Sequence, residues 1–267
     1  MTASTLSVKI TAKTALKNNW IKASAACLIV VFSYLVLGMA ASFTAYISNN
    51  FAAAAVFTIV SVFLLSPLFF GLIRFFWRML FGADDFPSSV FYCFSSKKAY
   101  MRALKLTLSL LVRAVFFGIV LFVPAFIVDL FAGSFIYDAL KIPTPLWTSN
   151  LYYLSLFLKS AAAVILAFIM ARYYMAPFLI AADENMEVAE AAHMSDIISK
   201  RTMLDFIYLI FSFFGWILLS ALVFPLIFTM PYILTSIGVH VRFAVAEYNK
   251  RIDFKNTESS DTFVADI

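Results

Sequence analysis

Two long stretches of the chain carry no charged side chain. One runs from Ala23 to Ile73 and the other from Phe206 to Val241. An apolar helix crosses a bilayer in about 20 residues, so the first stretch predicts two crossings and the second predicts two shorter ones. Two further apolar stretches, Leu106 to Val128 and Leu151 to Ala171, each hold a single charge. The pattern predicts an all-α, polytopic membrane protein.

The predicted organisation is one membrane domain over residues 1–250 and a polar cytoplasmic tail at 251–267. Six transmembrane helices are expected at about 23–45, 51–73, 106–128, 151–171, 206–223 and 232–249, with short interfacial helices between them. The composition agrees, because 63% of the residues are hydrophobic and only 13% are charged, which no soluble domain could keep in solution.

The basic residues alternate with the predicted spans. Seventeen of the 20 lie in four blocks around residues 9–22, 74–105, 172–201 and 242–255, whereas the intervening connections hold almost none. Basic residues concentrate on the cytoplasmic side of membrane proteins, so we expect both termini to be cytoplasmic. The net charge of +5 follows from this topology, and the predicted partner is the lipid bilayer rather than nucleic acid.

The three predicted pairs of spans suggest an internal repeat. Each pair follows a short stretch that ends in a basic cluster, and the even-numbered spans share a proline, at Pro67, Pro177 and Pro231. Three copies of an interfacial helix plus a transmembrane hairpin is one hypothesis. Its alternative is unrelated hairpins that share only membrane-protein composition.

A separate cytoplasmic helix is predicted from Asn185 to Ser199, with Asn185 or Asp183 as its cap. Its polar side chains recur at three-residue spacing on one face, which makes the helix a candidate docking site for a protein partner. These residues are Glu187, Glu190, His193 and Asp196.

Charged residues inside the predicted spans form a candidate polar site. Lys159 lies about nine residues into the fourth span, where an unpaired ammonium is costly. Asp129 is the nearest predicted partner, with Asp138 behind it, and Arg113 lies in the third span. The group is either a polar pathway for a ligand or a structural arrangement. In the second case Lys159 pairs with Asp129 or extends outward to the headgroups, and Arg113 extends to the cytoplasmic headgroups.

Basic residues at the predicted membrane boundary are candidate contacts for anionic lipid headgroups. Arg74 and Arg78 flank Trp77, which is equally typical of plain interfacial anchors. The full set is Arg74, Arg78, Lys97, Lys98 and Arg172.

Catalytic and metal-binding patterns are missing from the sequence. His193 and His240 lie on different elements and not in a zinc-binding spacing, and the sequence has no glycine-rich phosphate loop. The two cysteines, Cys27 and Cys93, are expected to be free thiols. We therefore expect no enzyme activity, no metal and no cofactor.

Several segments carry a resemblance to a known family. They are Ala171 to Asn185, ARYYMAPFLIAADEN, with Glu190, Ala191, Ser195, Ser199 and Met203 after it; Phe211 to Trp216; Met230 to Tyr232; Phe243 to Tyr248; and Ala15, Leu16, Asn19 and Trp20. The chain resembles the bacterial integral-membrane family of domain of unknown function 975. That family is similar to the membrane domain that accompanies some glycerophosphodiester phosphodiesterases. The resemblance implies a six-helix fold in a bacterial plasma membrane, and it implies no enzyme, because this chain lacks the soluble barrel.

Two functional hypotheses follow. The first is a non-enzymatic accessory or scaffold component of a transport, secretion or envelope system, which binds a membrane or cytoplasmic partner through the helix at 185–199. The alternative is a transporter of a small solute, peptide or lipid that uses the polar site around Lys159.

Overall fold

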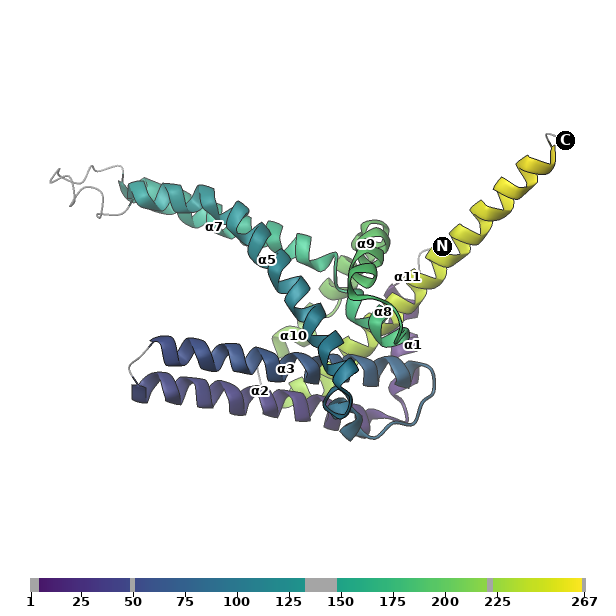
Figure 1. The fold of residues 1–267 in the computed structure, drawn as a ribbon, viewed down its shortest axis with the longest axis horizontal. Helices are drawn as coiled ribbons and strands as arrows, with labels where there is room; N and C mark the ends of the chain where they lie inside the picture. The colour runs from purple at the N-terminus through teal and green to yellow at the C-terminus, as the bar shows by residue number, and fades with distance from the viewer. Residues whose placement is uncertain (1–4, 49–50, 133–147, 220–222, 266–267) are drawn as a thin grey trace. The chain divides into compact units, whose positions relative to one another are not determined.

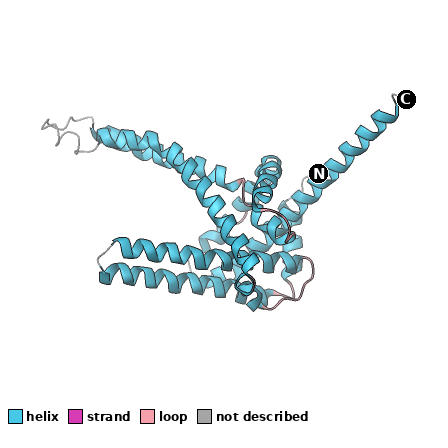
Figure 2. Ribbon diagram, viewed as in Figure 1, coloured by secondary structure: helices cyan, strands magenta, loops and turns pink. Residues whose placement is uncertain are grey.

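The computed structural model describes residues 5–48, 51–132, 148–219 and 223–265. Their regular secondary structure is helical throughout (Figure 2). The helices are α1 (Thr5–Leu16), α2 (Trp20–Ser48), α3 (Phe51–Leu80), η1 (Pro87–Phe91), α4 (Tyr92–Ser95), α5 (Lys97–Ala132), α7 (Thr148–Ala171), α8 (Ala176–Ala182), α9 (Val188–Phe211), α10 (Phe214–Leu219) and α11 (Val223–Ala265).

Five stretches of helix in the described part of the chain are long and apolar enough to cross a membrane: Trp20–Thr44, Ala55–Leu80, Lys97–Ala132, Asn150–Ala182 and Ile227–Ile252. Their surfaces agree with this, since large apolar side chains such as Phe32, Met39 and Phe116 are exposed. In the most apolar window of α5 only 6% of the residues are buried, so lipid or another apolar surface must cover this helix.

The chain forms two compact units, Met1–Leu106 with Met175–Ile267, and Thr107–Tyr174. In the first unit α2 and α3 lie side by side as an antiparallel hairpin (Figure 1). One hydrophobic core lies where the start of α2 meets the end of α3, and it includes Ala26, Leu72 and Phe76. A second core joins α1 to α9 and α11 through Val8, Leu209 and Val239.

Two glycines set the path of the chain after α3. Gly82 has a φ of +79°, a left-handed conformation that ends α3 at little steric cost. Gly71 lies against η1, where a Cβ atom would come within 1.9 Å of the Val90 carbonyl oxygen. The missing side chain at Gly71 therefore lets the η1 backbone pack directly on α3.

The predicted fifth span, 206–223, is not one helix. α9 ends at Phe211, a turn follows at Ser212 and Phe213, and α10 begins at Phe214. The Lys9 Nζ donates to the Ser212 carbonyl oxygen at 3.1 Å and lies 4.6 Å from the centre of the buried Phe213 ring. Lys9 of α1 thus provides a hydrogen bond to a backbone carbonyl oxygen in the turn. The six spans and the threefold repeat predicted from the sequence are not confirmed.

Other helix ends also differ from the predicted bounds. The helix expected at 185–199 begins at Val188 and continues to Phe211, and its N-cap is Glu187, with no side-chain cap bond. Asp183 instead accepts a hydrogen bond from the Asn185 N–H at 2.8 Å. α11 is continuous over residues 224–231, which separate the predicted spans 206–223 and 232–249, and it holds the buried Pro231 inside it. It also extends through the expected tail to Ala265.

Candidate functional site

Arg74, Glu184 and Tyr92 form a polar cluster in the first unit. The Arg74 guanidinium donates to the Glu184 carboxylate at 2.7 Å and lies 3.4 Å from the centre of the Tyr92 ring. The Tyr92 hydroxyl donates to the same carboxylate at 3.1 Å. Charge-assisted hydrogen bonds are among the stronger ones, so the cluster ties α3 and α4 to the connection between α8 and α9.

Arg102 of α5 holds the same connection through its backbone. Its Nη2 donates to the Asp183 carbonyl oxygen at 2.8 Å, with longer contacts to the Met186 and Ile180 carbonyl oxygens at 3.3 and 3.5 Å. The end of α8 leaves carbonyl oxygens without helical partners, and the guanidinium provides donors for them. In the sequence Arg102 was considered only as one of the basic residues that could contact lipid headgroups, and its bonds to this connection were not predicted; the acidic pair Asp183 and Glu184 was the available signal.

The cluster shifts the pKa values of its members. The hydrogen bond from Tyr92, followed by that from Arg74, lowers the pKa of Glu184, so the carboxylate stays charged at neutral pH. Burial raises the pKa of Tyr92 and raises that of the neighbouring Cys93 thiol to about 11. Cys93 is therefore protonated and a poor nucleophile at neutral pH.

A second acidic pair follows α3. Asp84 forms an ion pair with Lys22, and the Asp85 carboxylate forms an ion pair with the Arg78 Nε at 3.0 Å. Arg74 and Arg78, predicted as lipid contacts, are thus paired within the protein. Lys97 and Lys98 are exposed and form no ion pair with an acidic residue whose side chain the structure describes, while Arg172 is partly buried.

α9 has one buried face and one exposed face. Ala191, Ser195 and Ile198 are buried, and the Ser195 hydroxyl accepts from the Met175 N–H at 3.2 Å, which anchors the helix beside α8. On the other face, Glu187, Glu190 and His193 are exposed as predicted, whereas Asp196 forms an ion pair with Lys200 at 2.9 Å.

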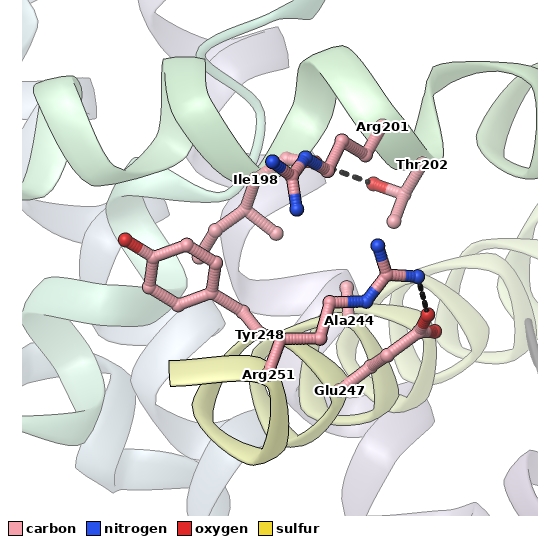
Figure 3. A pocket seen from close by; sticks show the side chains of 7 residues that line it. All are labelled: Ile198, Arg201, Thr202, Ala244, Glu247, Tyr248 and Arg251. Carbon is pink, nitrogen blue, oxygen red and sulfur yellow. Dashed lines mark hydrogen bonds and ion pairs between the residues drawn. The ribbon is translucent and has the colours of Figure 1, made fainter. Parts of the chain in front are cut away.

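A shallow groove lies between α9 and α11 (Figure 3). Arg201 and Arg251 extend over it from opposite helices, and Glu247 forms an ion pair with Arg251. Burial, followed by the nearby Glu247, raises the pKa of Asp205 on the same side of α9. The groove leaves water-sized molecules about 30 Å³, far below the several hundred Å³ of small-molecule pockets, so it is too small for a small-molecule ligand. Its remaining lining residues are Ile198, Thr202, Ala244 and Tyr248.

The second unit contains the predicted intramembrane pair. The Lys159 Nζ lies 2.6 Å from the Asp129 carboxylate, and the buried Ser155 hydroxyl donates to the same carboxylate. The side chains of Lys159 and Asp129 are 43% and 32% exposed, so the pair lies on the flank of the hairpin. Asp138, the second predicted partner, is outside the described residues.

Arg113 does not join this pair. It precedes Asp129 on α5 by about 24 Å at 1.5 Å per residue. Its guanidinium lies instead 4.7 Å from the centre of the Tyr173 ring. The structure therefore divides the predicted three-residue site into an ion pair and a separate cation–π contact.

In the part of the chain that the structure describes, no three His, Cys, Asp or Glu side chains gather in a group that could hold a metal ion. His193 is exposed on α9, whereas His240 is buried on α11 beside the Phe206 ring. The two histidines thus lie in different surroundings.

Comparison with known proteins gives one match. Residues 1–242 match the model of a family described as a protein of unknown function, DUF975. No curated protein and no solved structure matches the chain. The predicted relation to the membrane domains of glycerophosphodiester phosphodiesterases is not shown by these comparisons and stays a prediction.

Proposed function

The chain belongs to the DUF975 family, whose function is not established, and we propose that it is a multi-pass membrane protein that acts as a non-enzymatic accessory or scaffold subunit. In this proposal the apolar helices reside in a bacterial plasma membrane with both termini in the cytoplasm. The exposed face of α9 and the α9–α11 groove bind a protein partner of a transport, secretion or envelope system.

One observation carries the proposal: α9 is anchored along one face and presents charges without partners along the other. Glu187, Glu190 and Arg201 form no ion pair with any acidic or basic residue whose side chain the structure describes. α9 is also absent from the five stretches apolar enough to cross a membrane. A polar helix face with unpaired charges is suited to recognition of a protein surface with complementary charge.

Site-directed cross-linking tests the proposal. A photoreactive amino acid replaces Glu190 or Arg201 in cells, and Lys13, exposed on α1, is the matched control. We expect one protein to be cross-linked at both α9 positions and not at Lys13. The double change Glu187→Lys and Glu190→Lys should lower its recovery about tenfold, the scale expected for loss of complementary charges. If neither position yields a reproducible adduct, or the adduct also forms from Lys13, the proposal is wrong.

The alternative is a transporter of a small solute, peptide or lipid around Lys159. The partial exposure of Lys159 and Asp129 favours it, because a substrate could reach either member of the pair. A Lys159→Leu variant that retains the phenotype of the wild-type gene in a deletion strain would exclude this function.

A further inference from the structure

An apolar hollow opens on the first unit between α2, α3 and the short helices η1 and α4. Its walls come from Val36 on α2, from Leu64 and Leu68 on α3 and from Phe91 and Phe94 beside them. Ser33 also lines the hollow, but its hydroxyl donates to the Ile29 carbonyl oxygen at 2.8 Å. The hollow offers about 390 Å³ to water-sized molecules, which lies within the range of ligand pockets.

The start of α5 is held beside the hollow. The Phe94 ring lies 5.9 Å from the Tyr100 ring, and the Tyr100 hydroxyl contacts the Phe63 carbonyl oxygen of α3 at 3.4 Å. Lys97 and Lys98 begin α5 just after the extended Ser96, three and four residues beyond Phe94, and both are exposed. The first N–H groups of α5 also lack acceptors within the helix, and such groups favour an anion.

Positive charge and apolar space are therefore adjacent here, and the basic residues of α3 and the start of α2 are bound to other groups. Arg74, Arg78 and Lys22 are ion-paired with Glu184, Asp85 and Asp84. Arg102 is bound to backbone carbonyl oxygens. Lys97 and Lys98 have no such partner among the described side chains, and α5 begins a candidate membrane span at Lys97.

We propose that this hollow binds one anionic phospholipid, with an acyl chain between Val36, Leu64 and Phe94 and the phosphate at Lys97 and Lys98. The apolar lining provides favourable contacts for a hydrocarbon chain, while the two ammonium groups select a negatively charged headgroup over a zwitterionic one. The site is independent of the partner surface on α9.

The test is native mass spectrometry of the full-length protein in detergent, titrated with phosphatidylglycerol or with phosphatidylcholine that has the same acyl chains. We expect one phosphatidylglycerol to bind in preference to phosphatidylcholine. The double variant Lys97→Gln and Lys98→Gln should bind phosphatidylglycerol about 30-fold more weakly, from the usual contribution of a lysine near an anionic lipid. The matched control changes two exposed lysines away from the hollow, Lys13→Gln and Lys17→Gln, and should bind as the unmodified protein does.

A second pair of variants tests the apolar lining of the hollow independently of the two lysines. Val36→Trp fills the hollow and should abolish the preferred lipid, whereas Leu35→Trp, on the neighbouring exposed side of α2, should leave it bound. Equal affinity for the two lipids would overturn the proposal. Unchanged binding of phosphatidylglycerol by the double variant Lys97→Gln and Lys98→Gln would also overturn it. A mass of two protein chains that is lost with Val36→Trp would also overturn it, because a second copy would then cover the hollow.

Discussion

Arginine side chains in this protein mainly bind other groups of the chain at helix ends. Arg102 donates to carbonyl oxygens after α8, and Arg242 contacts the Leu80 carbonyl oxygen at 3.4 Å at the end of α3. Arg74 pairs with Glu184. Because a planar guanidinium offers several donors, one arginine can satisfy backbone acceptors and an acid that lie on different helices. Residues that resemble membrane-boundary anchors in the sequence thus serve as connections between elements.

The Lys159–Asp129 pair provides a prediction at this scale. Lys159→Leu leaves the Asp129 carboxylate without its cation on a largely apolar hairpin, so we expect a lower unfolding free energy. The double variant Lys159→Leu with Asp129→Leu should recover most of that loss, since it leaves no unpaired charge. Unfolding in a denaturing detergent measures both, with Ser160→Ala as the control, and equal losses in the single and double variants would contradict a coupled pair.

At the scale of elements, close backbone packing decides how the short helices are placed. η1 packs on α3 at Gly71, and Val90 is fully buried there. The turn between α9 and α10 is possible because Lys9 satisfies a carbonyl oxygen that a continuous helix would have bonded itself. At the turn, a contact between distant parts of the chain overrides the local preference for helix.

Gly71→Ala should separate η1 from α3, because the new Cβ atom meets backbone that cannot rotate away. We expect a loss of about 1–3 kcal/mol, measured as a lower temperature of unfolding. Gly38→Ala in α2 is the control: a Cβ atom there meets nothing within 4 Å, and alanine favours helix over glycine. If both variants unfold at the same temperature, the proximity of η1 to α3 has no energetic role.

At the scale of the whole molecule, the number of candidate crossings and the distribution of basic residues lead to different locations for the two termini. Five crossings would place the termini on opposite sides of the membrane, whereas the basic residues favour a cytoplasmic location for both. Two cytoplasmic termini require an even number of crossings. The number is four if one candidate stretch does not cross the membrane, and six if residues 206–223 complete a crossing without being one continuous helix.

Cysteine accessibility resolves the topology. Single cysteines replace Lys13 on α1 and Lys250 on α11 in a chain that lacks Cys27 and Cys93. We expect a membrane-impermeant maleimide to leave both positions unlabelled in intact cells and to label both after the cells are opened, because positive charge keeps these segments inside. Labelling of either position in intact cells would contradict cytoplasmic termini.

Local pattern was sufficient for α2, α3, α5 and α7. Long uncharged stretches determine helices of membrane-spanning length, because an apolar medium requires every backbone polar group to be bonded within the helix. Asp129 was predicted as the nearest partner of Lys159, with Asp138 behind it, and the structure contains the Lys159–Asp129 ion pair. The exposed positions of Glu187, Glu190 and His193 followed from helical periodicity.

Tertiary structure alone decided the break after Phe211, the ties from Arg74 and Arg102 to the α8–α9 connection, and the packing at Gly71. Lipid and a protein core are equally apolar, so the hydrophobicity of residues 206–223 could not distinguish a crossing from a segment packed on α1. Arg74 and Glu184 are 110 residues apart, and no local periodicity encodes which acid a given arginine binds. The sequence by itself determined which segments must leave water, while the fold decided which of them bury one another.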